Sequence, residues 1–404
     1  MNLIYIASLD FYTKPNPSFH LMTTMLEDVL SAGHSVSLIG CAENGVDKHI
    51  PDELEKFDTF KYSLIDVPNV KKSAFVKRYI EGIKYSWKVK KELKKIIDDG
   101  DVIFVQSSPT VLYTLLFAKK QAKNKKIIYN VQDMFPGSSI ASGVMNQKWM
   151  QKVFFMLQKI AYKNADVITA ISDDMKDKLV EQGVPENKIK VIVNWFDDKS
   201  VHQVKWDENR FVKKYNMSKD KFYIQYAGTM GYVFDYKMVI EVARCLTHNE
   251  KIVFQMIGEG SQKQAFMDEA KSLELDNIQF LPLESQDMVS DVYSACSVCF
   301  IPLKKGVIGN SVPSKAGLLM ACKKAIVTSA DKGSKYCAMI NDNLIGKAVS
   351  SDSFDDAINA LTYFYNNREK CIEYGENGYN YGHDLYSRDK NMKEYLSLFE
   401  NCCE

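Results

Sequence analysis

The sequence predicts an α/β protein built from two Rossmann-like, doubly wound domains that face a cleft. Three observations indicate this fold class. The 404 residues exceed what one compact core usually holds. Short apolar runs alternate with longer segments of helical periodicity, which is typical of parallel sheets covered by helices. These runs form two series on either side of a polar stretch at residues 195–215, where we expect the hinge.

The apolar runs of both series are expected to be strands. Those of the first series are 2–8, 34–40, 101–107, 125–132, 165–172 and 189–195, with a helix over 20–32. Those of the second series are 222–228, 251–258, 278–283, 297–303, 324–329 and 345–350. We predict an N-terminal domain over 1–198, a C-terminal domain over 199–384, and a final helix over 385–404 that packs back toward the first domain.

Composition excludes several classes of protein. Hydrophobic residues make up 46% and charged residues 25%, as in soluble globular proteins, and a net charge of +1 argues against a general nucleic-acid binder. No apolar run approaches the ~20 residues of a membrane span, and the N-terminus resembles a strand rather than a signal peptide. Nine scattered cysteines indicate a reducing, cytoplasmic compartment. Cys296 and Cys299 form a lone CxxC without a second pair, so we expect no metal site.

Two glycine-containing loops follow strands of the second series. In "YAGTMGY", Gly228 and Gly231 permit close backbone approach and Thr229 offers a hydroxyl, which suits a phosphate. "MIGEGSQK" repeats the arrangement with Gly258 and Gly260. Glycines after strands also form ordinary turns, and neither loop is the GxGxxG of a nicotinamide site.

A third loop, "GNSVPSKAGLLMA" at 309–321, turns polar just before an apolar helix. Ser311 or Ser314 can cap that helix, and Pro313 suits its start. Free helix amides and the charge of Lys315 would together form a small anion site. The alternative is a capped surface helix with a solvated lysine. Three such loops in one domain favour the anion-binding interpretation.

Polar residues also follow strands in the first domain. Gln132 and Asp133 lie at a strand end just before Pro136, where the carboxylate could bind a sugar hydroxyl or cap the next helix. Ser18 and His20 follow the first strand, and His20 could equally be a residue in the first turn of its helix.

Residues 70–100 hold ten Lys or Arg, with Phe75, Tyr79, Tyr85 and Trp87 interleaved. A solvated helix face is the usual explanation. The alternative is a surface that contacts anionic lipid headgroups, with the aromatic rings at the interface. An RNA-binding groove would need a recognition motif that the stretch lacks.

The order of these loops resembles that of the GT-B glycosyltransferases, specifically the retaining family four enzymes of polysaccharide assembly. The similar pieces span nearly the whole chain: "SAGHSVSLIG", "YNVQDMFP", "AISDDMKDKLVEQGVPENKIKVIVNWFD", "YAGTMG", "IGEGSQK" and "SVPSKAGLLMACKKAIV". "QDMFP" with "SVPSK" is most similar to the bacterial capsule, O-antigen and exopolysaccharide branch.

The resemblance implies a function. The C-terminal domain would bind a nucleotide-diphosphate sugar, a UDP-sugar by expectation, with the diphosphate near Gly228, Thr229 and Ser314. The N-terminal domain would bind a lipid-linked sugar acceptor at the inner face of the plasma membrane. Hexosyl or N-acetylhexosaminyl transfer with retention, without a metal or other cofactor, would follow. The chain lacks an aspartate-any-aspartate motif, in agreement.

The sequence departs from the family pattern at several positions. Many relatives have two glutamates in the third loop, where this chain has Asn310 and Leu318. Asn310 could still bind a sugar hydroxyl. Thr229 and Asp235 stand where many relatives have a basic pair, which leaves Lys315 as the phosphate cation.

Two further departures concern the first domain. Ser18 occupies one position of the double glycine that follows the first strand in many relatives, and Gln132 occupies the position of their histidine. We therefore expect Lys315, Asn310 and Asp133 to act in catalysis, and Ser18, His20 and Gln132 to bind the acceptor. Two alternatives remain open. One is a GT-B epimerase acting on a nucleotide sugar, and the other is a catalytically silent partner of a true transferase.

Overall fold

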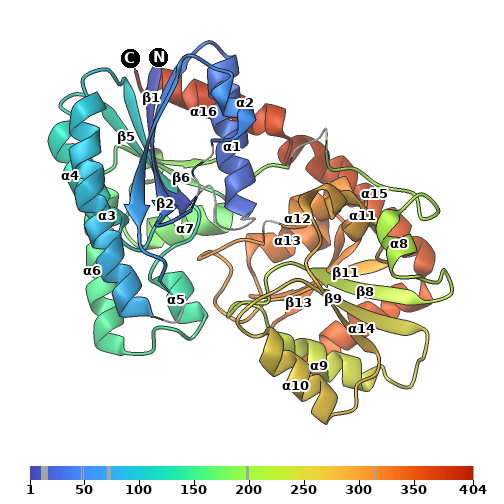
Figure 1. Cartoon of the computed structure of the whole chain (residues 1–404). Coiled ribbons are helices and arrows are strands. Elements are labelled where there is room, and N and C mark those ends of the chain that lie inside the picture. Colours follow the sequence, from blue (N-terminus) through green and yellow to red (C-terminus); the bar gives the residue numbers. More distant parts are fainter. Residues whose placement is uncertain are drawn as a thin grey trace. The chain divides into compact units, whose positions relative to one another are not determined.

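The computed structural model describes residues 1–10, 17–46, 48, 50–70, 74–196, 200–313 and 315–403, and only the backbone of 8–10 and 17–19. By its contacts the chain divides into two compact units. Unit 1 comprises Met1–Gly137, Met145–Asn194 and Asn391–Glu404, and unit 2 comprises Ser138–Val144 and Trp195–Lys390. Each unit has its own sheet covered by helices (Figure 1).

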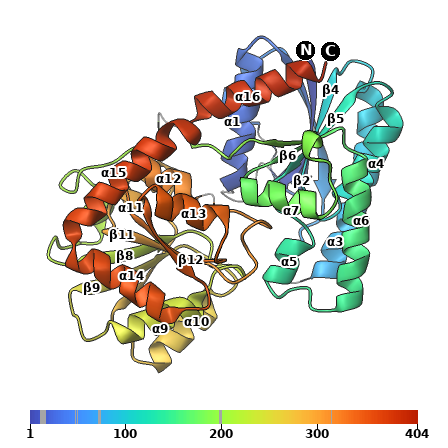
Figure 2. The ribbon, with the colours of Figure 1, turned by 180° about the vertical axis from the view of Figure 1, so that it is seen from behind.

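Unit 1 is built on a seven-stranded parallel sheet in the order β3-β2-β1-β4-β5-β6-β7. The strands are β1 (Asn2–Asp10), β2 (Ser35–Glu43), β3 (Phe60–Val67), β4 (Val102–Gln106), β5 (Lys126–Val131), β6 (Val167–Ala170) and β7 (Ile189–Val191). The helices are α1 (Pro17–Ser31), α2 (Asp52–Glu55), α3 (Phe75–Ile96), α4 (Val111–Gln121), α6 (Lys148–Lys163), α7 (Asp173–Glu181) and the short η1 (Glu186–Lys188). Helices α5 (Gly137–Ala141) and α16 (Arg388–Asn401) each include residues of both units. Figures 1 and 2 show α3, α4 and α6 on one flank of the sheet, and α1 and α16 on the other.

The structure confirms the strands predicted for the first series and adds one. The predicted runs correspond to β1, β2 and β4 to β7, whereas β3 was not predicted. As an edge strand, β3 leaves much of its surface to solvent. Its sequence therefore mixes Lys61, Ser63 and Asp66 with apolar residues, and Ile65 is its one buried residue. Such a strand lacks the continuous apolar run by which the others were found.

Unit 2 is built on a six-stranded parallel sheet in the order β10-β9-β8-β11-β12-β13. Its strands match every run predicted for the second series: β8 (Phe222–Ala227), β9 (Ile252–Ile257), β10 (Ile278–Leu281), β11 (Val298–Pro302), β12 (Ile326–Ala330) and β13 (Gly346–Ser350). Its helices are α8 (Arg210–Lys214), α9 (Tyr236–Cys245), α10 (Lys263–Ser272), η2 (Gln286–Met288), α11 (Val289–Ser294), α12 (Lys315–Ala321), α13 (Lys335–Asp342), α14 (Phe354–Asn366) and α15 (Arg368–Leu385). The predicted fold class of two Rossmann-like α/β sheets is confirmed.

The sheet of unit 2 has an apolar core on each face. Along β11, Phe300 packs into one cluster, while Cys299 and Ile301 pack into the other. This alternation follows from the two-residue period of a strand, and it explains why a doubly covered sheet shows continuous apolar runs. The strand order reverses between β8 and β11, which is the point where such sheets bind ligands at the carboxyl ends of their strands.

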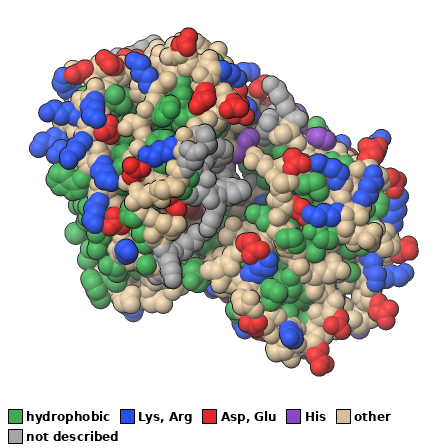
Figure 3. Space-filling view, in the orientation of Figure 1, with side chains coloured by type: hydrophobic (Ala, Val, Ile, Leu, Met, Phe, Trp, Pro, Cys, Tyr) green, Lys and Arg blue, Asp and Glu red, His purple; other side chains and the backbone are tan. Residues whose placement is uncertain are grey.

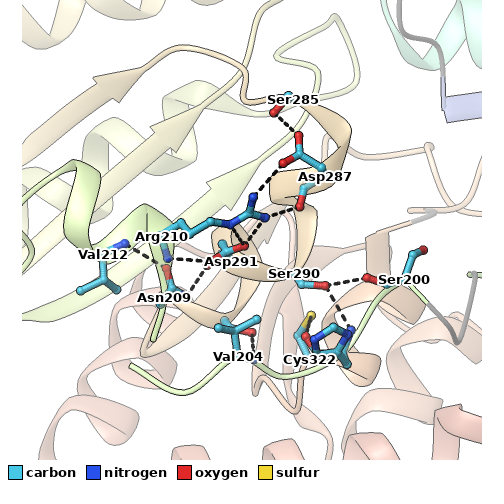
Figure 4. A network of polar contacts seen from close by, with 12 residues as sticks. Ser200, Val204, Asn209, Arg210, Val212, Ser285, Asp287, Ser290, Asp291 and Cys322 are labelled. Atoms are coloured by element: carbon cyan, nitrogen blue, oxygen red, sulfur yellow. Dashed lines mark hydrogen bonds and ion pairs between the residues drawn. The ribbon is translucent and has the colours of Figure 1, made fainter. Parts of the chain in front are cut away.

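An ion pair between the exposed side chain of Arg210 and the buried Asp291 fastens the start of unit 2 to α11 (Figure 4). The carboxylate of Asp291 accepts hydrogen bonds from the backbone N of Arg210 at 2.6 Å and from its Nε and Nη2 at 3.0 and 2.7 Å. The neighbouring Asn209 donates to the Asp291 carbonyl at 2.8 Å. Because Asp291 is buried, these bonds satisfy a charge that would otherwise be costly to bury.

Glycines on α15 allow α12 to pack closely against it. A Cβ on Gly375 would collide with the carbonyl of Lys323, just after α12, and a Cβ on Gly382 would collide with Met320. Nearby on α12, Gly317 lies against the side chain of Tyr386. A Cβ on Gly317 would be 3.2 Å from the nearest ring carbon of Tyr386. The contact fixes the helix that begins with Lys315.

Candidate functional site

The start of α12 and the end of β8 bring Lys315 and Gly228 together. The Nζ of Lys315 lies 3.5 Å from the ring centroid of Tyr226, and a Cβ on Gly228 would lie 2.7 Å from that Nζ. Within the described part of the chain, Lys315 forms no hydrogen bond or ion pair to another residue. Two of the residues predicted to bind an anion therefore adjoin one another, and the ammonium is available to a ligand.

Burial changes the acidity of this ammonium. Desolvation lowers the pKa of Lys315 to about 7, while the nearby Cys299 acts in the opposite direction. The face of the Tyr226 ring supports the charged form only in part. Without a ligand the group is therefore close to half-neutral at neutral pH, and an approaching anion would restore its charge.

Backbone amides of the loop after β8 alternate between bonded and unbonded. The amides of Gly228 and Met230 donate to the carbonyls of Ile257 and Glu259, each at 2.9 Å. In the described structure the amides of Thr229 and Gly231 between them make no such bond. Backbone amides without a partner can donate hydrogen bonds to a bound anion.

The glycines of the second loop have a packing role. A Cβ on Gly258 would collide with the carbonyl of Gly228, and a Cβ on Gly260 would collide with that of Met230. Gln262 donates from its backbone N to the Met230 carbonyl at 3.0 Å. Gly258 and Gly260 thus hold the two loops together, whereas a Cβ on Gly231 would meet only Thr229, at 3.5 Å.

The loop that leads to Lys315 is held by Asp331, which follows β12. The carboxylate of Asp331 accepts hydrogen bonds from the backbone N of Gly306 at 2.6 Å and of Ile308 at 3.0 Å. Asn310 is buried, its Nδ2 donates to the Gly306 carbonyl at 2.9 Å, and its Oδ1 has no hydrogen-bond partner within the described residues. The Asn310 side chain therefore has one unused acceptor.

Other predicted residues lie on the same loop. Ser311 and Pro313 are half-buried, and the Pro313 carbonyl accepts a hydrogen bond from the backbone N of Ala316 at 3.2 Å. Ser314 lies outside the described residues. Leu318 is half-buried on α12 and packs against the apolar cluster of Cys299 and Ile301.

Sequence reasoning missed residues that complete this corner of unit 2. Tyr226 lies beneath Lys315 and donates from its hydroxyl to the Thr229 carbonyl at 2.8 Å. Lys304, two residues past β11, is half-buried, and its Nζ contacts Gln262 Oε1 at 3.3 Å. Burial raises the pKa of the nearby Asp235, and the charge of Lys304 partly opposes that effect. The available signal was position, because polar residues directly after parallel strands gather at one edge of the sheet.

In unit 1, Gln132 lies in a hydrogen-bonded network at the end of β5. Its Nε2 donates to Asn130 Oδ1 at 2.9 Å, and its Oε1 accepts from Asn194 Nδ2 at 2.8 Å. Asn130 in turn donates to Thr169 and, at 3.0 Å, to the hydroxyl of Tyr395 on α16. These contacts give Gln132 a structural role in joining β5 to its surroundings.

The remaining predicted residues of unit 1 are Asp133, His20 and Ser18. Asp133 is exposed and has a contact within the chain. His20 is half-buried on α1, and its carbonyl accepts a hydrogen bond from Thr24 Oγ1 at 2.8 Å. Ser18 belongs to α1, but its side chain is outside the described structure.

The aromatic residues of 70–100 do not form the exposed row that the sequence suggested. Phe75 stacks on Phe135 at 6.3 Å between ring centroids, and Tyr79 meets Phe154 edge-on at 5.2 Å. Tyr85 is buried and donates its hydroxyl to the carbonyl of Ala7. Only Trp87 of the four is exposed. The expectation is wrong for the other three because helical spacing directs them toward the neighbouring helices and strands.

Acidic, histidine and cysteine side chains do not gather into a metal site in the described structure, where no group of three or more is placed to hold an ion. The buried thiols instead lie in apolar surroundings, and burial raises the pKa of Cys296 to about 11. Such thiols are inert at neutral pH.

Comparison with known proteins identifies both halves of the chain. Residues 21–200 match the family model described as Glycosyltransferase Family 4, and residues 207–381 match Glycosyl transferases group 1. The chain is 26% identical to a probable glycosyltransferase, WbjE of Pseudomonas aeruginosa, over 61% of its length. It is 27% identical over 41% of its length to WcaI of Escherichia coli, a putative colanic acid biosynthesis glycosyl transferase. The alignments span 62% and 41% of those two relatives.

Solved structures of other proteins share the fold of this chain. The structure of HepE from Anabaena in complex with UDP superposes with a TM-score of 0.74 at 12% identity, covering 99% of this chain and all of that one. At this identity the likeness concerns the fold alone. With two parallel α/β sheets and both glycosyltransferase models matched in order, the chain belongs to the family four glycosyltransferases of the GT-B fold.

Proposed function

We propose that this glycosyltransferase moves a sugar, with retention of anomeric configuration, from a UDP-sugar to a lipid-linked glycan acceptor during assembly of a surface polysaccharide. The observation that carries the proposal is the ammonium of Lys315, which lies beside Gly228 and has no hydrogen-bond or ion-pair partner among the described residues. The description of WcaI as a colanic acid glycosyl transferase supports the choice of a surface polysaccharide, and the UDP complex of HepE supports the choice of nucleotide.

The donor diphosphate would be bound by groups of unit 2. Lys315 supplies the cation, and the free amides of Thr229 and Gly231 supply hydrogen bonds. As the bond to the sugar breaks, negative charge grows on the departing diphosphate, and a fixed ammonium in a partly dry site stabilises it strongly. Approach of the diphosphate raises the pKa of Lys315 from about 7, so the lysine is fully charged when it is needed.

We further propose that no divalent metal is required, because Lys315 and the free amides can neutralise the diphosphate. Asn310 Oδ1 is the group best placed on the loop to accept a hydrogen bond from a donor sugar hydroxyl. Nucleotide binding measured with and without EDTA tests the metal claim. Unchanged stabilisation supports it, and loss of stabilisation that Mg²⁺ or Mn²⁺ restores contradicts it.

Acceptor binding is assigned to unit 1, with Asp133 and His20 as the candidate contacts. Asp133 is exposed at the end of β5, where a sugar hydroxyl could reach it. Gln132 would act by holding that strand end in place, through its bonds to Asn130 and Asn194. A lipid-linked acceptor would place the enzyme at the cytoplasmic face of a membrane.

Thermal unfolding with UDP, GDP, CMP and dTDP tests the donor site. A ligand at 100 times its Kd adds about 2.7 kcal/mol to the free energy of unfolding, which raises Tm by several degrees. We expect UDP to stabilise the parent and to lose most of that effect in Lys315→Ala. Lys305→Ala is the matched control, since Lys305 lies on the same loop but is exposed and paired with Asp352 at 2.6 Å.

The alternative to an active transferase is a catalytically silent partner subunit, and two features of the loop before α12 and of α12 itself favour it. Leu318 offers no carboxylate, and the Asn310 amide is tied to the Gly306 carbonyl. If no nucleotide at millimolar concentration shifts the Tm of the parent, the silent partner becomes the better account.

A further inference from the structure

Helix α6 exposes a row of large apolar side chains to solvent. The exposed fractions are 69% for Trp149, 40% for Val153, 56% for Met156 and 37% for Ile160. At 100° per residue these four positions fall within an arc of about 60° on one side of the helix. The opposite side packs inward through Phe154, Gln158 and Ala161, so the row is additional to the packed face.

The lysines of α6 lie along one border of this row. They are Lys148, Lys152, Lys159 and Lys163. On the same helical projection they fall about 40° to 100° to one side of Trp149. Helix α6 has no acidic residue, and no carboxylate in the described structure pairs with any of the four lysines.

The wider surroundings of α6 are also poor in acid. From Val102 to Ala165 the chain holds nine lysines and one acidic residue, Asp133. Figure 3 shows hydrophobic side chains along the lower left edge, where Figure 1 places α6, with Lys and Arg side chains on the flank above. A second copy of so basic a face would be repelled, whereas an anionic surface would be attracted.

We propose that α6 is a membrane-docking helix that lies flat on an anionic lipid surface. The apolar row enters the boundary between headgroups and acyl chains, and the bordering lysines bind lipid phosphates. None of the described helices is long and apolar enough to cross a bilayer. The proposal rests on the proposed function for its purpose, which is to bring the enzyme to a lipid-linked acceptor.

Helix α3, where the sequence placed lipid contact, is less suited to that role. It exposes Val76, Ile80 and Trp87, but its lysines are partly neutralised. Glu81 pairs with Lys84 at 2.7 Å, and Glu92 pairs with Lys95 at 2.8 Å. The ring of Trp87 is also engaged by Phe117, with 4.8 Å between centroids.

Vesicle co-sedimentation of the full chain tests the proposal. The probes are vesicles of phosphatidylcholine with 30% phosphatidylglycerol, and of phosphatidylcholine alone. We expect the parent to bind the anionic vesicles and Trp149→Ser/Met156→Ser to bind them about tenfold more weakly or worse. Ile372→Ser on α15 is the matched control, because Ile372 is also 69% exposed, and it should bind as the parent does.

Three further variants locate the contact. Lys152→Glu/Lys159→Glu should lose binding to the anionic vesicles, and Val76→Ser/Ile80→Ser on α3 should keep most of it. In Trp149→Phe, binding should persist while the blue shift of tryptophan emission on adding vesicles largely disappears. That signal reports where Trp149 goes, and a mere loss of stability would not produce it.

Several outcomes would overturn the proposal. They are a parent that ignores anionic vesicles, parent-like binding by Trp149→Ser/Met156→Ser or by Lys152→Glu/Lys159→Glu, loss of binding only in the α3 variant, or a parent dimer that the α6 substitutions dissociate. The UDP-induced rise in Tm is measured on the same samples. If that rise persists while vesicle binding fails, the docking proposal is wrong and the donor site stands. If vesicle binding persists without the rise, the reverse holds.

Discussion

Lys315 concentrates the chemistry of the candidate donor site in one ammonium group. Its pKa of about 7 in the free protein should rise when a diphosphate binds. Binding of UDP at pH 8 is therefore expected to take up close to one proton, and affinity should fall up to about tenfold per pH unit above 7. Calorimetric titration in two buffers with different ionisation enthalpies measures the proton uptake.

Lys315→Arg is the control for that measurement, since a guanidinium stays charged and should bind UDP without proton uptake. The same group also affects stability. Between pH 7 and its ordinary pKa of 10.5, the unfolded chain holds a proton that the folded chain lacks. This contribution to the free energy of unfolding therefore rises with pH across that window and is constant below it. If the parent and Lys315→Arg take up equal numbers of protons when UDP binds, the proton does not go to Lys315 and the assignment is refuted.

The glycines of the two loops should separate by function. Gly231→Ala is expected to leave Tm nearly unchanged, because its Cβ meets only Thr229, yet to weaken UDP binding about tenfold by intruding between two free amides. Gly258→Ala should lower the free energy of unfolding by 3 kcal/mol or more as an order of magnitude, through its φ of +129° and a backbone collision. Thermal unfolding with and without UDP distinguishes them. A Gly231→Ala variant that binds UDP like the parent would argue against the amide site.

Much of the candidate site could be predicted from residue type and position. Lys315 and Gly228 were both assigned to an anion site, and the structure places them side by side. The packing role of Gly258 and Gly260 could not be predicted, because it depends on which loop lies against them. The contact of Tyr226 with Lys315 could not be predicted for the same reason. In the sequence, Tyr226 is one of several apolar residues of a strand, and nothing there indicates which ring a distant lysine contacts.

At the level of helices and strands, the Arg210–Asp291 pair makes a prediction about stability. Arg210→Met leaves the buried Asp291 carboxylate without its cation, and should lower the free energy of unfolding clearly. Arg244→Met is the control, because Arg244 and Glu241 form an exposed pair within one helix, and its loss should change the free energy of unfolding much less. Urea unfolding compares the two. Similar small losses would mean that the Arg210 pair does not hold α8 to α11.

Strands were easier to predict than exposed helix faces. Strands covered by helices on both faces are recognisable in the sequence as apolar runs, whereas the edge strand β3 is not. On α6, apolar residues occupy two opposite faces, and periodicity alone does not tell which one is packed. The basic composition of 70–100 drew attention to α3 instead, although its carboxylates pair with its lysines.

For the chain taken together, both sheets reverse their strand order once, and the predicted loops follow the strands around those points. Each compact unit has its own sheet, and we propose donor binding in unit 2 and acceptor binding in unit 1. The fold class followed from the alternation of apolar runs. The candidate site instead depends on a few side chains whose neighbours come from distant segments, which the order of residues along the chain does not reveal.

The most direct test is a calorimetric comparison of UDP and UMP binding to the parent, Lys315→Ala and Lys305→Ala. A charge-assisted contact to the second phosphate contributes about 1.5–3 kcal/mol, so the parent should prefer UDP by about tenfold or more. The preference should survive in Lys305→Ala and largely vanish in Lys315→Ala. If Lys315→Ala prefers UDP as strongly as the parent does, Lys315 does not bind the donor diphosphate, and the account of this site is wrong.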